Sequence, residues 1–300
     1  MPSSLPARSV ARRAIAAATA ALALVAAAPV AGAQPALPGI PAGGEGKEMV
    51  VFGDSYAANP TVSPISYARG YDPEAASRSR VAGQMSGCGQ DPNSWPHVAA
   101  RVSGVGEANL ADYSCNGTGR IPAAQLLTFV ETAISRGDVG PKTDKVLLMY
   151  GGLDAFAWAD AATNGGNPAS AFRATVKRVA DRVRAVAPGA HVYIVGYPRV
   201  AHQDKVCLIN TDPENNHEII APGLDALEAS LNNTLIAASR EADAWFINLY
   251  DATGPHSTCA KPSERYVSGW FDTTSKHNMK LHPTINGSVA IGHMVASVLK

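Results

Sequence analysis

Gly53, Asp54 and Ser55 directly follow an apolar segment, residues 48–52, that predicts a buried strand. A serine at a sharp strand-to-helix turn exposes its hydroxyl at the end of the sheet, close to backbone N–H groups that can stabilise an oxyanion. Such a hydroxyl can attack an acyl group when a neighbouring base removes its proton. The same three residues also occur in turns where Asp and Ser only bond to the backbone, so this segment alone leaves both interpretations open.

His282 is the residue that favours the catalytic interpretation. It precedes Pro283, which fixes the local backbone, and a final apolar segment, 287–299, with the pattern of a helix. This places an imidazole in a loop at the edge where parallel strands end and bind ligands. Ser–His pairs are defined by their roles and not by their order in the chain. The sequence therefore predicts Ser55 as a nucleophile and His282 as its general base.

Four short blocks, in this order and at the ends of predicted strands, resemble those of the SGNH/GDSL hydrolases. Tyr56 stands where the fourth letter of the first block is often Leu. The resembling segments are Gly53-Asp54-Ser55, Asn116-Gly117, Gly151-Gly152-Leu153-Asp154 and His282-Pro283. The resemblance implies a flavodoxin-like parallel sheet of about five strands and the hydrolysis of carboxylic esters, such as acyl lipids or acetylated sugars, through an acyl-enzyme. It implies no metal and no organic cofactor.

The resemblance also assigns roles to individual residues. The backbone N–H groups of Ser55 and Gly117 would form the oxyanion hole. Four further residues are candidates for the surroundings of the cleft: Asp54, Asn116, Leu153 and Asp154.

Two positions depart from the family's pattern. Leu153 stands where the third block has an oxyanion-donating Asn, and Met279 stands where an Asp usually orients the histidine three residues later. We expect a main-chain carbonyl from residues 270–280, or the side chain of Asp272 or Asn278, to orient the imidazole instead. Because both replacements are apolar, a catalytically impaired protein that binds a cell-envelope glycolipid or glycan is an alternative. An acyltransferase using the same residues is another.

The elements that must position these residues alternate along the chain. Almost continuous apolar strands separated by amphipathic helices predict a three-layer α/β/α sandwich with a parallel sheet. The predicted strands cover residues 48–52, 108–113, 145–150, 191–195 and 245–250, and the predicted helices cover 96–102, 121–135, 169–186, 224–242 and 287–299. Three long segments begin at the carboxyl ends of strands and are expected to build the cleft: 56–94, 198–223 and 252–285.

The beginning of the chain predicts export. Arginines, an apolar run and Ala31-Gly32-Ala33 indicate a signal peptide over residues 1–33, followed by a short linker, 34–46, and one domain, 47–300. The 25 basic and 25 acidic side chains of the full sequence balance, and residues 1–33 hold three arginines and no acid. The weakly acidic remainder has no basic stripe for nucleic acid and no further candidate membrane span. We expect a secreted or cell-envelope monomer whose partner is a small-molecule, lipid or glycan ester.

The four cysteines of an exported chain predict two disulfides. Three pairings are possible, and the sequential one, Cys88–Cys115 with Cys207–Cys259, closes the shorter loops. Because no two cysteines have the close spacing of zinc ligands, we expect no metal site.

Overall fold

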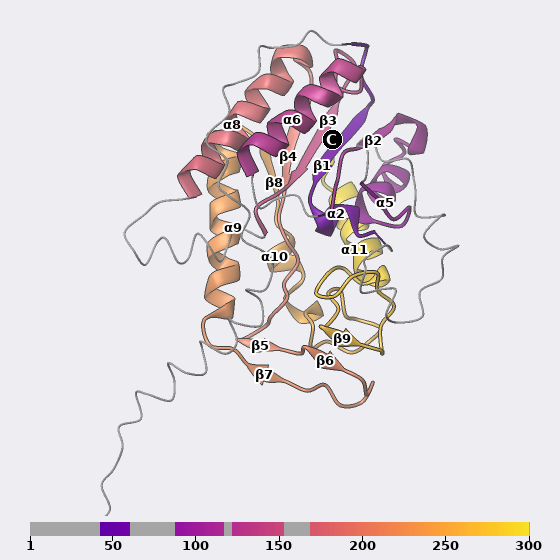
Figure 1. Cartoon of the computed structure of the whole chain (residues 1–300), viewed down its shortest axis with the longest axis vertical. Coiled ribbons are helices and arrows are strands. Elements are labelled where there is room, and N and C mark those ends of the chain that lie inside the picture. Colours follow the sequence, from indigo (N-terminus) through magenta and orange to yellow (C-terminus); the bar gives the residue numbers. More distant parts are fainter. Residues whose placement is uncertain (1–42, 61–87, 117–121, 153–168, 300) are drawn as a thin grey trace, which may run out of the picture. The chain divides into compact units, whose positions relative to one another are not determined.

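Five parallel strands form the central sheet, in the order β2-β1-β3-β4-β8 (Figure 1). The computed structural model describes residues 43–60, 88–116, 122–152 and 169–299. The strands are β1 (Met49–Gly53), β2 (Leu110–Asp112), β3 (Lys145–Met149), β4 (His191–Val195) and β8 (Trp245–Ile247). Every residue of β1 and β3 is buried, as expected for strands covered on both faces. The predicted fold class is confirmed.

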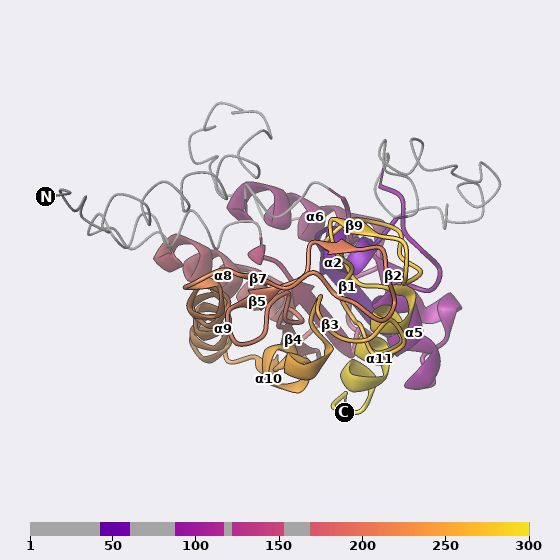
Figure 2. The same cartoon turned by 90° about the horizontal axis from the view of Figure 1, so that it is seen from below.

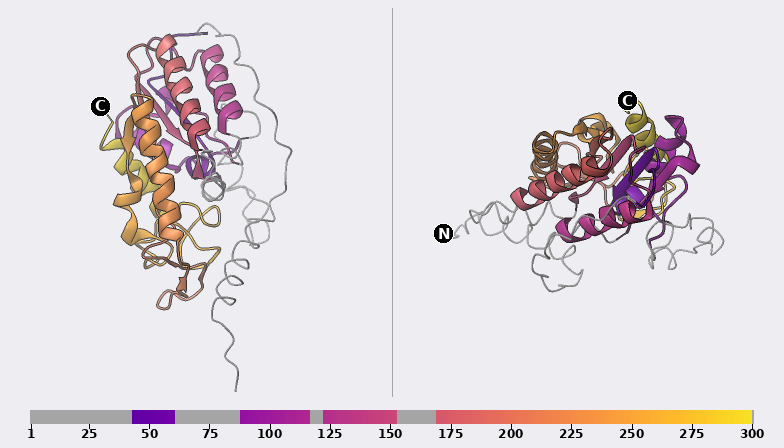
Figure 3. Two further views of the ribbon diagram at one scale, coloured as in Figure 1. Left: turned by 90° about the vertical axis from the view of Figure 1, so that its left-hand side faces the viewer. Right: turned by 90° about the horizontal axis from the view of Figure 1, so that it is seen from above.

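Helices cover both faces of this sheet (Figures 2 and 3). On one face α5 (Trp95–Val102) packs against α11 (Ile285–Ala296). On the other face α8 (Ala169–Val186) packs against α6 (Pro122–Arg136), and its buried side chains include Val176, Val179 and Val183. Helix α9 (Leu224–Glu241) lies beside α8 and contacts β4 and β8. These helices hold the strand ends, and hence the loops that follow them, in fixed positions.

The predicted elements are present, and several of them differ at their ends. β2 is shorter than the predicted 108–113, because residues 107–109 form the 3-10 helix η1 (Glu107–Asn109). β8 ends at Ile247 and not at 250, because the side chain of Asn248 accepts a hydrogen bond from the Asp251 N–H and starts the short helix α10 (Leu249–Ala252). The last helix begins at Ile285, two residues earlier than predicted, because Thr284 caps it through the Gly287 N–H.

The long segments after β4 and β8 are joined to each other. The first contains β5 (Lys205–Val206), β6 (Ile209–Asn210) and β7 (Ile219–Ile220), and the second contains the 3-10 helix η3 (Gly254–His256) and β9 (Phe271–Asp272). β5 pairs with β7, whereas β6 pairs in parallel with β9 across the two segments. A disulfide between Cys207 and Cys259 adds a covalent link between them.

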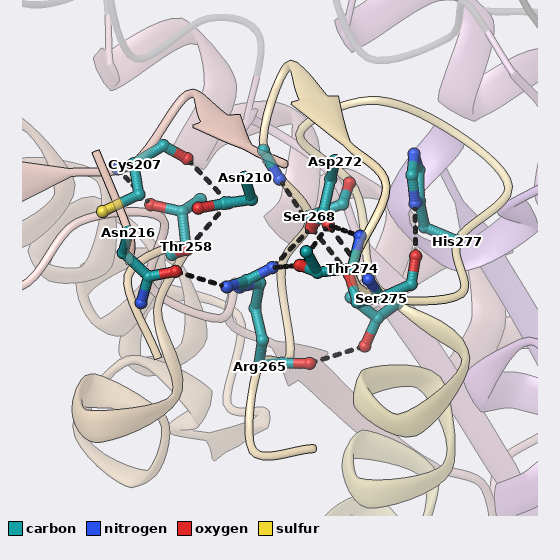
Figure 4. A network of polar contacts seen from close by, with 12 residues as sticks. Cys207, Asn210, Asn216, Thr258, Arg265, Ser268, Asp272, Thr274, Ser275 and His277 are labelled. Atoms are coloured by element: carbon teal, nitrogen blue, oxygen red, sulfur yellow. Dashed lines mark hydrogen bonds and ion pairs between the residues drawn. The ribbon is translucent and has the colours of Figure 1, made fainter. Parts of the chain in front are cut away.

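A buried arginine is the third link between these segments (Figure 4). The guanidinium of Arg265, which is fully buried, donates from Nη1 to Asp272 Oδ2 at 2.9 Å and from Nη2 to Asn216 Oδ1 at 2.9 Å. Asp272 also accepts from the hydroxyl of Ser275 at 2.6 Å. Burial alone would raise the pKa of Asp272, but the Ser275 hydrogen bond and the Arg265 charge together hold it at about 2. The carboxylate is therefore charged whenever the protein is folded near neutral pH.

The predicted signal peptide, residues 1–33, lies outside the described residues. Within the part of the chain that the structure describes, no helix is both long and apolar enough to cross a membrane. A second disulfide joins Cys88 to Cys115, so the pairing is sequential.

Removing the Asp272 carboxylate should destabilise the fold strongly, because it leaves the Arg265 charge buried without its counter-charge. We expect Asp272→Ala to lower the free energy of unfolding by about 3–5 kcal/mol, measured by denaturant unfolding. The matched control is Asp181→Ala, which removes an exposed partner of Lys177 on α8. The control should change stability by about 0.3–0.5 kcal/mol, and equal effects of the two variants would contradict the prediction.

Candidate active site

Ser55 is the first residue of a four-residue helix, α2 (Ser55–Ala58), that starts where β1 ends. Asp54 caps this helix, because its carboxylate accepts the Tyr56 N–H at 2.9 Å. Gly53 lets the turn close: a Cβ at this position would lie 2.3 Å from the Ala57 Cβ. The first N–H groups of a helix have no acceptor within that helix. The Ser55 N–H is therefore not used by α2 and can bind an oxygen of a ligand.

The structure brings Ser55 and His282 together although 227 positions separate them in the chain. His282 lies in the loop before α11, and its Nε2 is 2.7 Å from Ser55 Oγ. The loop runs antiparallel to residues 266–269: the Ser268 N–H donates to the His282 carbonyl at 3.0 Å, and the Thr284 N–H donates to the Tyr266 carbonyl at 2.9 Å. The backbone that carries the imidazole is therefore held by an isolated antiparallel bridge, Val267 with Pro283.

A main-chain carbonyl occupies the position that an acid would take beside the imidazole. The Lys280 carbonyl lies 2.7 Å from His282 Nδ1. Because a carbonyl only accepts hydrogen bonds, Nδ1 carries the hydrogen and Nε2 has the lone pair that faces Ser55. Lys280 is itself anchored, since its ammonium lies 4.7 Å from the ring centres of Trp270 and Phe271.

The two side chains considered for this orienting role have other partners. Asp272 bonds to Arg265 and to its neighbours. Asn278 donates to the Asn59 carbonyl at 2.8 Å and contacts Asp91. Of the three expected groups, only the main-chain carbonyl faces the ring.

The ring of His282 is neutral near neutral pH, so Nε2 keeps the lone pair that faces Ser55. Desolvation lowers the pKa of His282 to about 4, although the hydrogen bond to Lys280 acts in the opposite direction. A neutral imidazole whose free nitrogen faces a serine hydroxyl is the arrangement that general-base activation of a nucleophile requires.

Asp54 lies next to this pair but contacts neither reacting group. Besides capping α2, its carboxylate accepts the hydroxyl of Tyr197 at 2.5 Å. Burial raises the pKa of Asp54 to about 7, although the Tyr197 hydrogen bond acts against the shift. The Tyr197 ring also lies against Gly152, where a Cβ would be 2.7 Å from the ring. Asp54 thus joins the ends of β1 and β4 at the site.

Of the four remaining predicted site residues, the structure describes Asn116. Asn116 is exposed and follows Cys115, whose N–H donates to the Gly53 carbonyl at 2.9 Å, so the second block lies beside the end of β1. Gly117, Leu153 and Asp154 lie outside the described residues.

Sequence analysis assigned no role to three side chains at the site: Tyr56, which packs on His282, and Asn59 and Tyr197, which bond to residues beside the pair. The Tyr56 ring centre is 4.6 Å from that of His282 and 5.3 Å from that of Tyr197. Tyr56 is recognisable in the sequence only as a replacement of the usual Leu. Tyr197 belongs to the strand end Gly196-Tyr197-Pro198, which resembles that of exported members of the family, but this pattern gives it no role at the site. Asn59 carries no local signal, because its contacts are to residues distant in the chain.

Comparison with known proteins agrees with this arrangement. The model of the GDSL-like lipase/acylhydrolase family matches residues 51–289. An esterase of Streptomyces scabiei is 26% identical over 319 aligned positions, covering 88% of this chain and 85% of the relative. Lipase 2 of Streptomyces coelicolor is 27% identical over 250 positions, covering 73% of this chain and 75% of the relative.

Solved structures share the fold. The phospholipase A1 of Streptomyces albidoflavus NA297 superposes with a TM-score of 0.51 at 20% identity, covering 86% of this chain and all of that chain. The extracellular lipase of Streptomyces rimosus gives a TM-score of 0.53 at 19% identity, covering 85% of this chain and all of that chain.

These matches define the class of protein as an esterase or lipase, an enzyme that hydrolyses carboxylic esters. The chain belongs to the GDSL-like lipase/acylhydrolase family. The residues matched by the family model include both Ser55 and His282.

The depressed pKa of His282 can be tested without any substrate. We expect the imidazole signals of His282, followed by NMR in histidine-labelled protein, to titrate with a midpoint near pH 4, because desolvation disfavours the charged ring. A His282→Gln variant assigns the signal by its disappearance. A midpoint near the ordinary value of about 6.5 would show that the ring is solvated.

Proposed function

We propose that this protein is an exported serine carboxylic ester hydrolase that works through a Ser55–His282 dyad and an acyl-enzyme intermediate. The observation that carries the proposal is the 2.7 Å contact between Ser55 Oγ and the nitrogen of His282 that is free to accept a proton. The second contact of the ring, to the Lys280 carbonyl, supports the same assignment of its two nitrogens.

In the first half of the reaction, Ser55 Oγ attacks the ester carbonyl carbon while His282 Nε2 takes the hydroxyl proton. The imidazolium that forms keeps its Nδ1–H directed at the Lys280 carbonyl, whose partial negative charge favours the charged ring. The tetrahedral intermediate then expels the alcohol, which receives the proton from Nε2. The acyl group remains on Ser55 as an ester.

In the second half, water replaces the alcohol. His282 Nε2 removes a proton from the water as it attacks the acyl-enzyme, and returns it to Ser55 Oγ when the acid leaves. The Ser55 N–H, at the start of α2, and the Gly117 N–H are the proposed oxyanion donors. Leu153 offers no side-chain donor, so backbone groups carry this role.

The proposed substrate is a small-molecule, lipid or glycan ester, and the proposed location is outside the cytoplasm. Two disulfides, Cys88–Cys115 and Cys207–Cys259, support export, because such bonds persist in oxidising compartments. The predicted signal peptide over residues 1–33 supports it independently.

Replacing the nucleophile tests the proposal directly. We expect Ser55→Ala to lower kcat on short acyl esters at least about 10⁴-fold and to abolish labelling by a fluorophosphonate, measured by hydrolysis assays and mass spectrometry. The matched control is Ser239→Ala, which removes a buried hydroxyl on α9. Unchanged hydrolysis by Ser55→Ala would refute the dyad, and transfer of the acyl group only to an added alcohol would identify a transferase.

Export makes a separate prediction about the N-terminus. When the full chain is expressed in a secreting bacterial host, we expect the protein in the medium to begin at Gln34, because the small residues Ala31 and Ala33 suit signal peptidase. N-terminal sequencing measures this. Protein that stays inside the cell with residues 1–33 attached would contradict the prediction.

A further inference from the structure

We propose that Tyr56 is a positioning residue that holds the backbone before His282 in the conformation that orients the imidazole. This inference rests on the proposed function of the Ser55–His282 pair and goes beyond it, because Tyr56 touches neither the nucleophilic oxygen nor a reacting carbonyl. The argument begins at Leu281, the residue between His282 and its orienting carbonyl.

Leu281 adopts a left-handed backbone conformation, with φ of 53°. Residues other than glycine, asparagine and aspartate avoid this region because Cβ approaches the following carbonyl oxygen. This conformation folds the chain so that the Lys280 carbonyl lies 2.7 Å from Nδ1 of His282, only two residues away. The orientation of the base therefore depends on an unfavourable backbone angle that other contacts have to maintain.

Tyr56 supplies such a contact. Its hydroxyl donates to the Leu281 carbonyl at 2.5 Å, while the Leu281 N–H donates to the Gly269 carbonyl at 3.3 Å. Both sides of Leu281 are thus fixed by hydrogen bonds. The Tyr56 ring also packs on the imidazole, with ring centres 4.6 Å apart and planes inclined by 34°.

Asn59 holds the other side of His282 in the same way. Its amide Nδ2 donates to the Pro283 carbonyl at 3.0 Å and lies 3.1 Å from Ser288 Oγ. Asn59 is the C-terminal cap of α2, with φ of 37°. The carbonyls immediately before and after His282 are therefore bonded to side chains of α2 and its cap.

The placement of these side chains on α2 has a mechanical consequence. Ser55 is the first residue of the same short helix. The nucleophile and the clamp, meaning the side chains of Tyr56 and Asn59, are therefore carried by one helix and its cap. A shift of α2 would carry the His282 backbone with it and preserve the contact between Oγ and Nε2. Met279 offers no carboxylate to restrain the ring, and the clamp provides the restraint through the backbone instead.

The experiment compares Tyr56→Phe with Tyr113→Phe. Both variants keep a ring and lose one hydrogen-bonded hydroxyl, but the hydroxyl of Tyr113 donates to Asp138, at 2.8 Å, and not to the His282 loop. We expect Tyr56→Phe to lower kcat on a short acyl ester by about 10- to 100-fold, with KM changed less than about twofold, because the base is misplaced. Tyr113→Phe should keep kcat within about twofold of the wild type, with a similar change in Tm.

A spectroscopic measurement separates positioning from a general loss of stability. In histidine-labelled protein, the Nδ1–H of His282 should give a downfield, slowly exchanging NMR signal, assigned by its loss in His282→Gln. We expect Tyr56→Phe to broaden or abolish this signal and Tyr113→Phe to retain it. The signal does not depend on turnover, so it tests the clamp even if Ser55→Ala refutes the proposed function.

A second background tests whether the hydroxyl acts through Leu281. Asn tolerates left-handed backbone better than Leu, so the loss caused by Tyr56→Phe should be smaller in a Leu281→Asn protein than in the wild type. An equal loss in both backgrounds would overturn the proposal. So would a Tyr56→Phe protein that retains both kcat and the Nδ1–H signal.

Discussion

The orientation of one imidazole is the constraint on which the site depends. A histidine can accept a proton on Nε2 only while Nδ1 keeps its hydrogen, and here the Lys280 carbonyl is the acceptor that keeps it there. Unlike the carboxylate of an Asp side chain, a main-chain carbonyl has no net charge and no rotatable side-chain bonds with which to follow the ring. The backbone on both sides of His282 therefore has to be fixed, and the hydrogen bonds from Ser268 and Asn59 fix it.

This requirement explains why the segment before α11 is so heavily bonded although it contains little regular structure. The buried guanidinium of Arg265 ties it to the segment after β4, and the Arg265 carbonyl accepts the hydroxyl of Thr284 at 2.7 Å, two residues after His282. The disulfide between Cys207 and Cys259 joins the same two segments. Polar and covalent links give this part of the molecule the rigidity that a hydrophobic core gives the sheet.

The departure of Met279 from the family's pattern has a structural answer in this arrangement. The absence of an Asp at position 279 was one of two reasons to consider a binding protein without turnover. This reason no longer applies, because the Lys280 carbonyl makes the contact with Nδ1. The other reason, Leu153, lies outside the described residues. An oxyanion hole built from backbone N–H groups, with Ser55 at the start of α2, needs no side chain there.

Sequence alone determined the order along the chain of the five sheet strands and the five long helices, because continuous apolar runs and helical periodicity are local properties. It also placed Ser55 and His282 at the ends of neighbouring elements, since the carboxyl ends of parallel strands share one edge. Tertiary structure decided which group faces Nδ1. Every residue has a carbonyl, and which one reaches the ring depends on the left-handed angle of Leu281 and on a tyrosine hydroxyl 225 positions away in the chain.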